Sequence, residues 1–492
     1  MGTLYIDGDW RAAAAGGTRD LLDPADGSVL RTVDEAGADD VRLAVEAAHR
    51  AFEGPWRTTT AAERSALLLR VADLLQRDRS ALAELETRDT GKTLVEAGID
   101  VDDVTAVFRY YAALAVGDPG RLVDAGSATV LSRVVYEPVG VCALIAPWNY
   151  PLLQMSWKVA PALAAGNTMV LKPSEVTPLS TVELVRLLAE AGLSQYPGVV
   201  NLLLGSGANA GGPLVEHPLV ELVSFTGGLA TGQAIMRSAA EGVKRVALEL
   251  GGKNPNIVFA DADLEAAVDY ALTGAFLHAG QVCSAGTRLI LHDSIAEEFA
   301  AELARRAERI VVGPGLDPAS QSGPLVSAQH RDKVEKYVAL GLEEGARLLA
   351  GGRRPSEAHL QDGYFYRPTV FAGCDRSMRI VQEETFGPIV TVETFETEAE
   401  AVALGNDTDY GLAGAVWTGD RDRAHRVAGA LRHGTVWIND FGPYLPQAEW
   451  GGFKRSGTGR ELGPTGLAEY QEAKHVYENT SPQPAYWFGR PE

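Results

Sequence analysis

Between residues 139 and 251 the sequence alternates short apolar runs with longer amphipathic segments, and this rhythm constrains the fold more than any other feature. The apolar runs occupy residues 141–146, 168–172, 199–204, 222–226 and 246–250. The segments between them, at 151–165, 178–191, 211–216 and 231–241, have helical periodicity. Strands that are apolar on both faces and alternate with helices indicate a parallel sheet covered on both sides. We therefore predict a Rossmann-like α/β domain that binds its ligand at the carboxyl ends of the strands.

Polar and glycine-rich stretches follow these apolar runs. They read PWNYP (147–151), KPSE (172–175), GSG (205–207), FTGG (225–228) and ELGGKN (249–254). Each of these stretches alone has a composition that is common at the ends of strands. Together they put two glycine-rich loops, a Lys–Glu pair, an amide and a carboxylate on one rim, a combination that suits a dinucleotide. Gly227 and Gly228 precede a helix whose free N–H groups suit a pyrophosphate, although the spacing is not G-x-G-x-x-G.

A chain of 492 residues exceeds what one hydrophobic core supports, so we expect more than one domain. Helical patterns at 264–278 and 294–311, with strands at 256–259 and 287–291, predict a second α/β unit. Residues 128–138 alternate like a strand but cannot bury a core by themselves, and residues 470–476 could pair with them. The predicted division is a cofactor domain (1–122 and 141–251), a catalytic domain (252–460) and an oligomerisation arm with tail (123–140 and 461–492).

Charge and composition exclude several classes of partner. The net charge of −21 disfavours nucleic acid and anionic membranes, and could weakly favour a cationic substrate. No apolar run approaches the roughly 18–20 residues that span a bilayer, and the first residues are too polar for a signal peptide. The chain has three widely spaced cysteines, Cys142, Cys283 and Cys374, so no disulfide framework is expected. We expect a cytoplasmic protein with no metal site.

Cys283 carries the strongest chemical suggestion in the chain. It lies in GQVCSAG, between a helical run and a strand-like run, with small neighbours that leave room for a substrate carbon. Small neighbours also let backbone N–H groups approach a developing oxyanion. A buried structural cysteine fits the same local sequence, so the surroundings alone leave both interpretations open.

The motifs taken together, in order and spacing, resemble the NAD(P)-dependent aldehyde dehydrogenase superfamily over essentially the whole chain. They are PWNYP, KPSE, FTGG, LELGGKNP, GQVCSAG, EETFGP and WGGFKRSGTGRELG. Within the superfamily, FLHAGQVCSAG, VWINDF and EAKHVYEN are most similar to bacterial betaine aldehyde dehydrogenases. The resemblance implies that Cys283 is a nucleophile that attacks an aldehyde carbon and passes through a thiohemiacetal and a thioester.

The resemblance also implies roles for four further polar residues. Asn149 and the Cys283 backbone N–H would donate to the oxyanion. Glu249 occupies the position of the base that activates the hydrolytic water, although an ordinary strand-end carboxylate is the alternative. Lys158 and Glu461 match a pair assigned to charge relay, and a structural ion pair is the alternative there.

NAD is the cofactor that the resemblance implies. Lys172 and Glu175 match positions that hold the adenosine ribose, and the Glu175 charge should repel the 2′-phosphate of NADP. Where many relatives have Ser, Gly228 can offer only its backbone N–H. The remaining predicted cofactor residues are Trp148, Ser174, Gly205, Gly227, Thr231, Leu250, Glu384 and Phe386.

The substrate predicted by this resemblance is an aldehyde, and the resemblance favours the cationic betaine aldehyde. Aromatic faces suit a quaternary ammonium, which cannot make ordinary hydrogen bonds. The predicted substrate residues are Tyr150, Trp157, Leu277, Tyr444 and Trp450. Leu277 replaces an aromatic residue of plant members, which weakens the cage on that side.

Three other functions stay open at this stage. A 4-aminobutyraldehyde-type or broad aldehyde dehydrogenase is the serious rival. Glu249 argues against an enzyme that passes the thioester to coenzyme A, and the intact Cys283, Glu249 and Asn149 argue against a non-catalytic scaffold. The resemblance further implies a homodimer or homotetramer, in which we expect the arm and the tail to pair across subunits.

Overall fold

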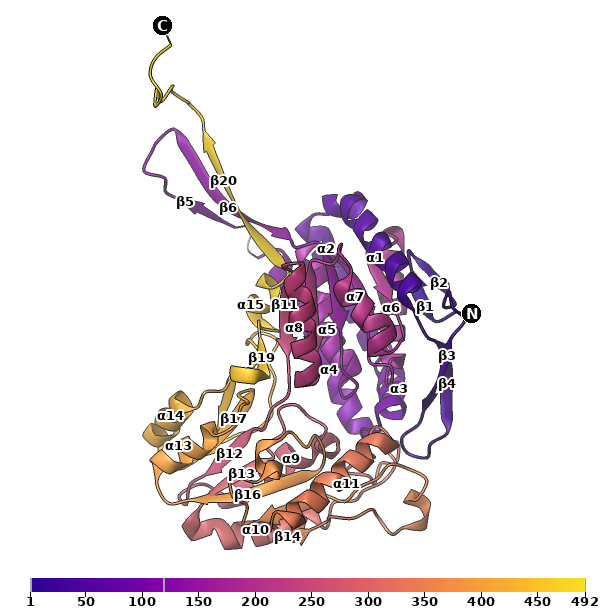
Figure 1. The fold of residues 1–492 in the computed structure, drawn as a ribbon, viewed down its shortest axis with the longest axis vertical. Coiled ribbons are helices and arrows are strands. Elements are labelled where there is room, and N and C mark those ends of the chain that lie inside the picture. Colours follow the sequence, from indigo (N-terminus) through magenta and orange to yellow (C-terminus); the bar gives the residue numbers. More distant parts are fainter. Residues whose placement is uncertain (1, 118–119, 492) are drawn as a thin grey trace.

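The computed structural model describes residues 2–117 and 120–491, so the predicted domain limits at residues 1 and 492 lie outside the described part. Two sheets and a projecting arm organise the chain (Figure 1). The first sheet has the strand order β19-β11-β10-β7-β8-β9-β1-β2. Its strands are β1 (Leu4–Ile6), β2 (Asp9–Arg11), β7 (Val141–Ile145), β8 (Thr168–Lys172), β9 (Val200–Leu202), β10 (Leu222–Thr226), β11 (Arg245–Glu249) and β19 (Gly457–Thr458).

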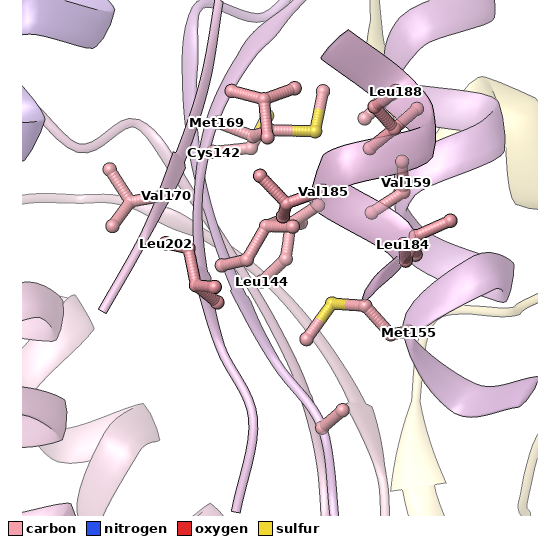
Figure 2. Packing of buried hydrophobic residues seen from close by; sticks show 14 of the residues in the cluster. Cys142, Leu144, Met155, Val159, Met169, Val170, Leu184, Val185, Leu188 and Leu202 are labelled. Atoms are coloured by element: carbon pink, nitrogen blue, oxygen red, sulfur yellow. The ribbon is translucent and has the colours of Figure 1, made fainter. Parts of the chain in front are cut away.

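The central strands β7 to β11 of this sheet are parallel, as the apolar rhythm predicts. Helices flank them at α1 (Ala38–Glu53), α2 (Ala61–Arg77), α3 (Arg79–Thr90), α4 (Leu94–Ala115), α5 (Pro151–Ala165), α6 (Leu179–Glu190), α7 (Gly212–Glu216), α8 (Leu229–Glu241) and α15 (Gly463–Ala468). Figure 2 shows side chains of the strands, such as Leu144 and Cys142, packed against Val159 and Val185 of the helices. Each fully buried aliphatic side chain contributes about 1.5–3 kcal/mol, so this core holds the strand ends in place.

The second sheet has the strand order β14-β15-β16-β13-β12-β17-β18 and is parallel except for the β14–β15 pair. Its strands are β12 (Pro255–Val258), β13 (Arg288–His292), β14 (Arg347–Ala350), β15 (Thr369–Ala372), β16 (Ile389–Phe395), β17 (Ala413–Trp417) and β18 (Thr435–Ile438). Its helices are α9 (Leu264–Phe276), α10 (Asp293–Ala307), α11 (Ala328–Glu343), α12 (Arg379–Gln382), α13 (Glu398–Asn406) and α14 (Arg421–Ala430). The second α/β unit is thereby present as predicted.

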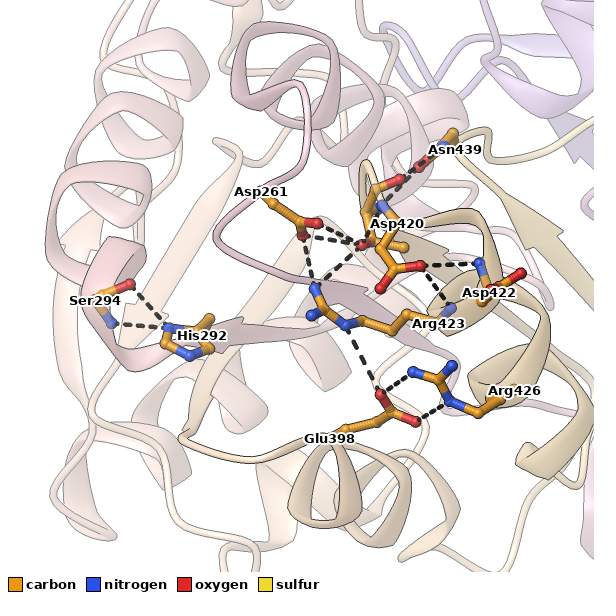
Figure 3. Close-up of polar contacts among 10 residues, drawn as sticks. Asp261, His292, Ser294, Glu398, Asp420, Asp422, Arg423, Arg426 and Asn439 are labelled. Carbon is orange, nitrogen blue, oxygen red and sulfur yellow. Dashed lines mark hydrogen bonds and ion pairs between the residues drawn. The ribbon is translucent and has the colours of Figure 1, made fainter.

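Ion pairs join the elements of this second unit. Arg423 of α14 contacts Asp261 at 2.9 Å and Glu398 at 3.7 Å, which connects the end of β12 to α13 (Figure 3). Deeper in the sheet, the Arg288 guanidinium on β13 donates two hydrogen bonds, of 2.8 and 2.9 Å, to the Glu393 carboxylate on β16. Both side chains are buried, so this pair is a fixed cross-strand contact.

The arm is a three-stranded sheet in the order β20-β6-β5, and it projects from the body (Figure 1). β6 (Val130–Pro138) pairs antiparallel with β20 (Gln471–Asn479) along nine residue pairs, and with β5 (Arg121–Val123). The expected pairing of arm and tail exists, but it forms within one chain and not across subunits. This corrects the prediction, and the physical reason is that α15 returns the chain to the base of β6.

The N-terminal end of the chain contains a hairpin and a tight connection between two helices. β3 (Thr18–Leu22) and β4 (Val29–Asp34) form the antiparallel hairpin. The connection runs from α3 to α4, where Gly91 adopts the left-handed conformation (φ 85°) after α3 and Thr93 caps α4. Within the described residues, no helix has the length and hydropathy needed to cross a membrane.

Candidate active site

Two cavities lie at the carboxyl ends of the strands of the first sheet, where ligands of parallel sheets bind. The larger has a volume of about 830 Å³ and the smaller about 210 Å³. Both are lined by Trp148, Gly227, Gly228 and His330, so the smaller cavity continues the larger one. Cys283, Glu249 and Asn149 line the smaller cavity, which brings three of the five predicted catalytic residues together.

Cys283 sits on a tightly built loop. α9 ends at Phe276, two residues before the predicted limit, because His278 and Ala279 adopt left-handed conformations with φ of 48° and 53°. The Asn254 side chain donates to the carbonyls of Cys283 and Ala285, both at 2.9 Å. These bonds fix the turn that presents the thiol to the cavity.

The electrostatic surroundings keep the Cys283 thiol protonated at rest. Burial raises its pKa, and the carboxyls of Glu384 and Glu249 raise it further, while the backbone N–H groups of Ser284 and Cys283 lower it. The same N–H groups are available to an oxyanion formed next to the sulfur. A base must therefore take the thiol proton before or during attack.

Asn149 follows β7 and is buried beside the nucleophile loop. Its Nδ2 donates to the Gln281 carbonyl at 2.8 Å. An amide nitrogen carries two protons, so one N–H stays available to the cavity after this bond is made. The geometry suits the predicted oxyanion donor.

Glu249 ends β11, and its carboxyl group is buried in the same cavity. Both carboxyl oxygens are buried, and neither has a hydrogen-bond partner among the described residues. Burial raises its pKa well above the ordinary value, and the nearby Glu461 adds to that rise. A carboxyl with a raised pKa and free oxygens is suited to accepting a proton from water or thiol.

Lys158 and Glu461 form a buried ion pair behind this carboxyl. Lys158 Nζ also donates to Thr226 Oγ1 at 2.8 Å and to Ser224 Oγ at 3.2 Å. One Glu461 oxygen has no partner among the described residues, and Lys158 lowers the pKa of Glu249. Charge relay and a structural ion pair are both compatible with these contacts, so the relay stays a prediction.

The larger cavity fits a dinucleotide. Lys172 Nζ lies 3.4 Å from the Glu175 carboxylate, and Glu175 is partly exposed to the cavity whereas Lys172 is buried. Gly228 is the N-cap of α8, and open space surrounds the position of its absent Cβ, so a phosphate could approach the helix N-terminus. The predicted residues on the walls of the two cavities are Trp148, Lys172, Ser174, Glu175, Gly227, Gly228, Thr231, Leu250, Glu384 and Phe386.

Gly205 behaves differently from the other predicted cofactor residues. A Cβ at Gly205 would lie 3.0 Å from the Ala36 carbonyl oxygen and 3.2 Å from the Ala210 Cβ, so this glycine packs against its own domain. Gly207 and Gly211 line the large cavity from the same loop. A contact between Gly205 and the cofactor stays a prediction.

The predicted aromatic residues form two groups. Trp157, Tyr444 and Trp450 contact one another, with ring centroids 4.8–6.3 Å apart. Tyr150 contacts the His278 ring at 5.5 Å, and Lys92 Nζ lies 3.9 Å from the centroid of the Tyr150 ring. Tyr444 also shares a 2.5 Å hydrogen bond with Ser284, next to the nucleophile. Leu277 is 44 % exposed at the end of α9, so it gives little cover to either group.

Sequence reasoning missed three residues that build this site. Asn254 holds the nucleophile turn, Gln281 accepts from the Val326 N–H at 2.9 Å, and His330 lines both cavities. The first two lie inside the motifs LELGGKNP and GQVCSAG, so their position was a usable signal. His330 lies in no predicted motif and only the tertiary structure brings it to the site.

A cysteine, a buried glutamate and an amide share one cavity at the carboxyl ends of a parallel sheet, and this combination defines the class of protein. Residues 10–476 match the model of the aldehyde dehydrogenase family, and the chain belongs to that family. It is 55% identical to the betaine aldehyde dehydrogenase of Bacillus subtilis, with 99% of each chain covered.

Two further comparisons extend this finding. The chain is 44% identical to aminoaldehyde dehydrogenase 2, peroxisomal, of Pisum sativum, over 99% of this chain and 98% of that protein. Among solved structures, it resembles a betaine aldehyde dehydrogenase from Staphylococcus aureus in complex with NAD+, with 52% identity and a TM-score of 0.97. That likeness covers 99% of this chain and 97% of the other.

Proposed function

We propose that this protein is an NAD-dependent aldehyde dehydrogenase whose substrate is betaine aldehyde. The observation that carries the proposal is the shared cavity of Cys283, Glu249 and Asn149, which opens into a cleft large enough for a dinucleotide. The similar proteins from Bacillus subtilis and Staphylococcus aureus, named as betaine aldehyde dehydrogenases, support the substrate. The NAD+ bound in the latter supports the cofactor.

In this proposal each residue has one chemical task. The Cys283 thiol gives its proton to solvent water, and the thiolate sulfur attacks the aldehyde carbon. Asn149 with the Cys283 N–H stabilises the oxyanion that forms. NAD, when bound, accepts the hydride from the former aldehyde carbon, which leaves a thioester on Cys283. Glu249 then takes a proton from water as that water attacks the thioester, and the carboxylate product leaves.

The protein surface around the aromatic group favours a cationic aldehyde. Burial and the neighbouring Cys283 raise the pKa of the Tyr444 hydroxyl most, and the carboxylates of Asp100 and Asp103 on α4 add to the rise, so both carboxylates act on Tyr444. Asp100 is paired with Lys92, whereas Asp103 has no ion-pair partner among the described residues. A negative potential beside aromatic faces attracts a quaternary ammonium, which supports betaine aldehyde over a neutral aldehyde.

An ω-amino aldehyde is the second substrate candidate. The Pisum sativum relative is named for aminoaldehydes, and the same carboxylates would attract a primary ammonium. Comparing kcat/KM for betaine aldehyde, 4-aminobutyraldehyde and the neutral isostere 3,3-dimethylbutanal separates the two candidates from a broad enzyme. If 3,3-dimethylbutanal had the highest kcat/KM of the three, the proposal of a cationic substrate would be contradicted.

The nucleophile has its own test. Cys283→Ala removes the thiol that forms the thioester, so dehydrogenase turnover should be lost while NAD still binds. Cys374→Ala is the matched control, because Cys374 lies outside both cavities and should keep full turnover. Substantial turnover of Cys283→Ala would refute the assignment.

We further propose a homodimer or homotetramer in the cytoplasm. The arm supports the assembly, because Leu122 is 76 % exposed and Tyr477 60 % exposed on a sheet with no core of its own.

A further inference from the structure

The loop that carries Phe386 is held in a conformation that few residues adopt. Phe386 has φ of 56°, in the left-handed region, which costs an L-residue about 1–2 kcal/mol. Such a conformation persists only where neighbouring groups enforce it. His330, at the start of α11, contacts the Phe386 carbonyl oxygen through Nε2 at 2.7 Å.

The donor in this contact is defined by chemistry. A carbonyl oxygen can only accept, so His330 Nε2 carries the proton and donates it. Burial lowers the pKa of His330 to about 4, so the ring is neutral at pH 7 and exists as the Nε2–H tautomer. The hydrogen bond thereby fixes the ring and the carbonyl together.

The His330 ring also contacts the aromatic wall of the cavities. Its centroid lies 4.9 Å from that of Trp148 and 6.1 Å from that of Phe386, both in edge-to-face geometry. Trp148 and Phe386 contact each other at 5.2 Å. All three rings line the smaller cavity, where Cys283 also lies.

This aromatic corner touches the nucleophile loop. A Cβ at Gly280 would lie 2.2 Å from the Gly387 carbonyl oxygen, so the two loops are in direct backbone contact. Gly387 packs on α11 as well, because a Cβ there would lie 2.4 Å from Val334 Cγ2. The start of α11 therefore meets the Phe386 loop and the Cys283 loop at one place, and Gln281 bonds to Val326 just before the helix.

We propose that His330 is a positioning residue. It holds Phe386 and Trp148 against the place that the nicotinamide must occupy for hydride transfer to occur beside Cys283. The proposal rests on the proposed function, because it assumes NAD in the cleft. His330 acts through its hydrogen bond to Phe386 and through ring packing on Trp148. It takes no proton from the substrate.

Two variants separate these contributions. His330→Phe keeps an aromatic ring but loses the donor, and His330→Gln keeps an N–H donor but loses the ring. Loss of one hydrogen bond should raise the NAD dissociation constant of His330→Phe about threefold to tenfold, measured by calorimetry without substrate. His330→Gln should recover part of this loss. With aldehyde deuterated at C1, the isotope effect on kcat should increase in His330→Phe, because hydride transfer becomes slower.

Arg331→Ala is the matched control. Arg331 is the next residue of α11, and its guanidinium donates to the Gly363 carbonyl at 2.8 Å, away from both cavities. It should lower the melting temperature without changing NAD affinity or the isotope effect. If His330→Phe keeps wild-type NAD affinity and isotope effect, or merely loses thermal stability as Arg331→Ala does, the proposal is wrong. Failure of the wild-type enzyme to oxidise aldehydes with NAD would instead overturn the proposed function.

Discussion

Glu249 is the residue whose surroundings most directly predict a kinetic result. Among the described residues its carboxyl oxygens have no hydrogen-bond partner, and burial raises its pKa, so it can accept a proton only after it has lost its own. Thioester hydrolysis should therefore accelerate as the pH rises through that raised pKa. Attack by the thiol and hydride loss consume no water, so they depend less on this base.

Glu249→Gln should reduce steady-state turnover about 100-fold or more, because general-base catalysis contributes roughly 10²–10⁴ in rate. A burst of NADH should precede the slow phase if acylation still outruns hydrolysis. Stopped-flow absorbance at 340 nm measures the burst. The control is Glu469→Gln, which alters a nearby carboxyl outside the cavity. Full turnover of Glu249→Gln would show that Glu249 is not the base.

Asp103 predicts a pH effect on substrate preference. Burial raises its pKa to about 6, with Asp100 and Asp102 adding to the rise, so its negative charge is lost as the pH falls below 6. Betaine aldehyde keeps its charge at every pH, and titration of the catalytic groups affects all aldehydes alike. The ratio of kcat/KM for betaine aldehyde over 3,3-dimethylbutanal should therefore fall between pH 7.5 and 5.

Asp103→Asn removes this charge at every pH. At pH 7.5 the kcat/KM ratio of this variant should already be lower than that of the wild type. The ratio of the variant should then change little between pH 7.5 and pH 5. The control is Asp102→Asn, because the Asp102 carboxylate is paired with Arg79 on the surface. A variant ratio that still falls with acid would show that Asp103 does not set the preference.

At the scale of elements, the end of β8 and the residues just after it are where we expect the cofactor to be selected. Glu175 lies on the wall of the large cavity, 3.4 Å from Lys172. In Glu175→Gln, the neutral amide should no longer repel a 2′-phosphate. The ratio of kcat/KM for NADP over NAD should rise on the order of tenfold, as expected for removing one like charge near a surface. Glu190→Gln, an exposed carboxyl on α6, should leave the ratio unchanged.

The strands β13 and β16 of the second sheet depend on a buried ion pair. Arg288→Leu would leave the Glu393 carboxylate buried without its partner, which costs about 3–5 kcal/mol. The melting temperature should drop clearly, and the double variant with Glu393→Leu should recover most of it. Arg347→Ala breaks an exposed pair with Glu297 on the same domain and should cost about 0–1 kcal/mol. Equal losses for Arg288→Leu and Arg347→Ala would contradict the argument.

At the scale of the whole molecule, the arm predicts assembly. β20, β6 and β5 form a sheet within one chain, so the oligomer that we propose would use the faces and free edges of that sheet and not the β6–β20 pairing. Sedimentation at micromolar concentration should show a dimer or tetramer. Leu122→Asp should shift the protein toward the monomer, whereas Leu342→Asp, on the exposed side of α11, should not. A wild-type monomer would contradict the proposal.

The sequence by itself determined the parallel sheets, because fully apolar strands can be satisfied only under helices on both faces. Its motifs also placed Asn149, Glu249 and Cys283 among the expected catalytic residues, a role that the resemblance to the aldehyde dehydrogenase superfamily implies. The strands depend on local periodicity and the motifs on short spacing, and a single chain records both directly.

Only the tertiary structure decided which residues meet across the cavities. His330 reaches Phe386 over 56 positions of sequence, and Lys158 reaches Glu461 over 303. The same is true of the arm, where β6 and β20 pair within one chain because α15 returns the backbone to the base of β6. Such contacts depend on how helices and sheets pack in space, and local patterning of residues carries no record of that packing.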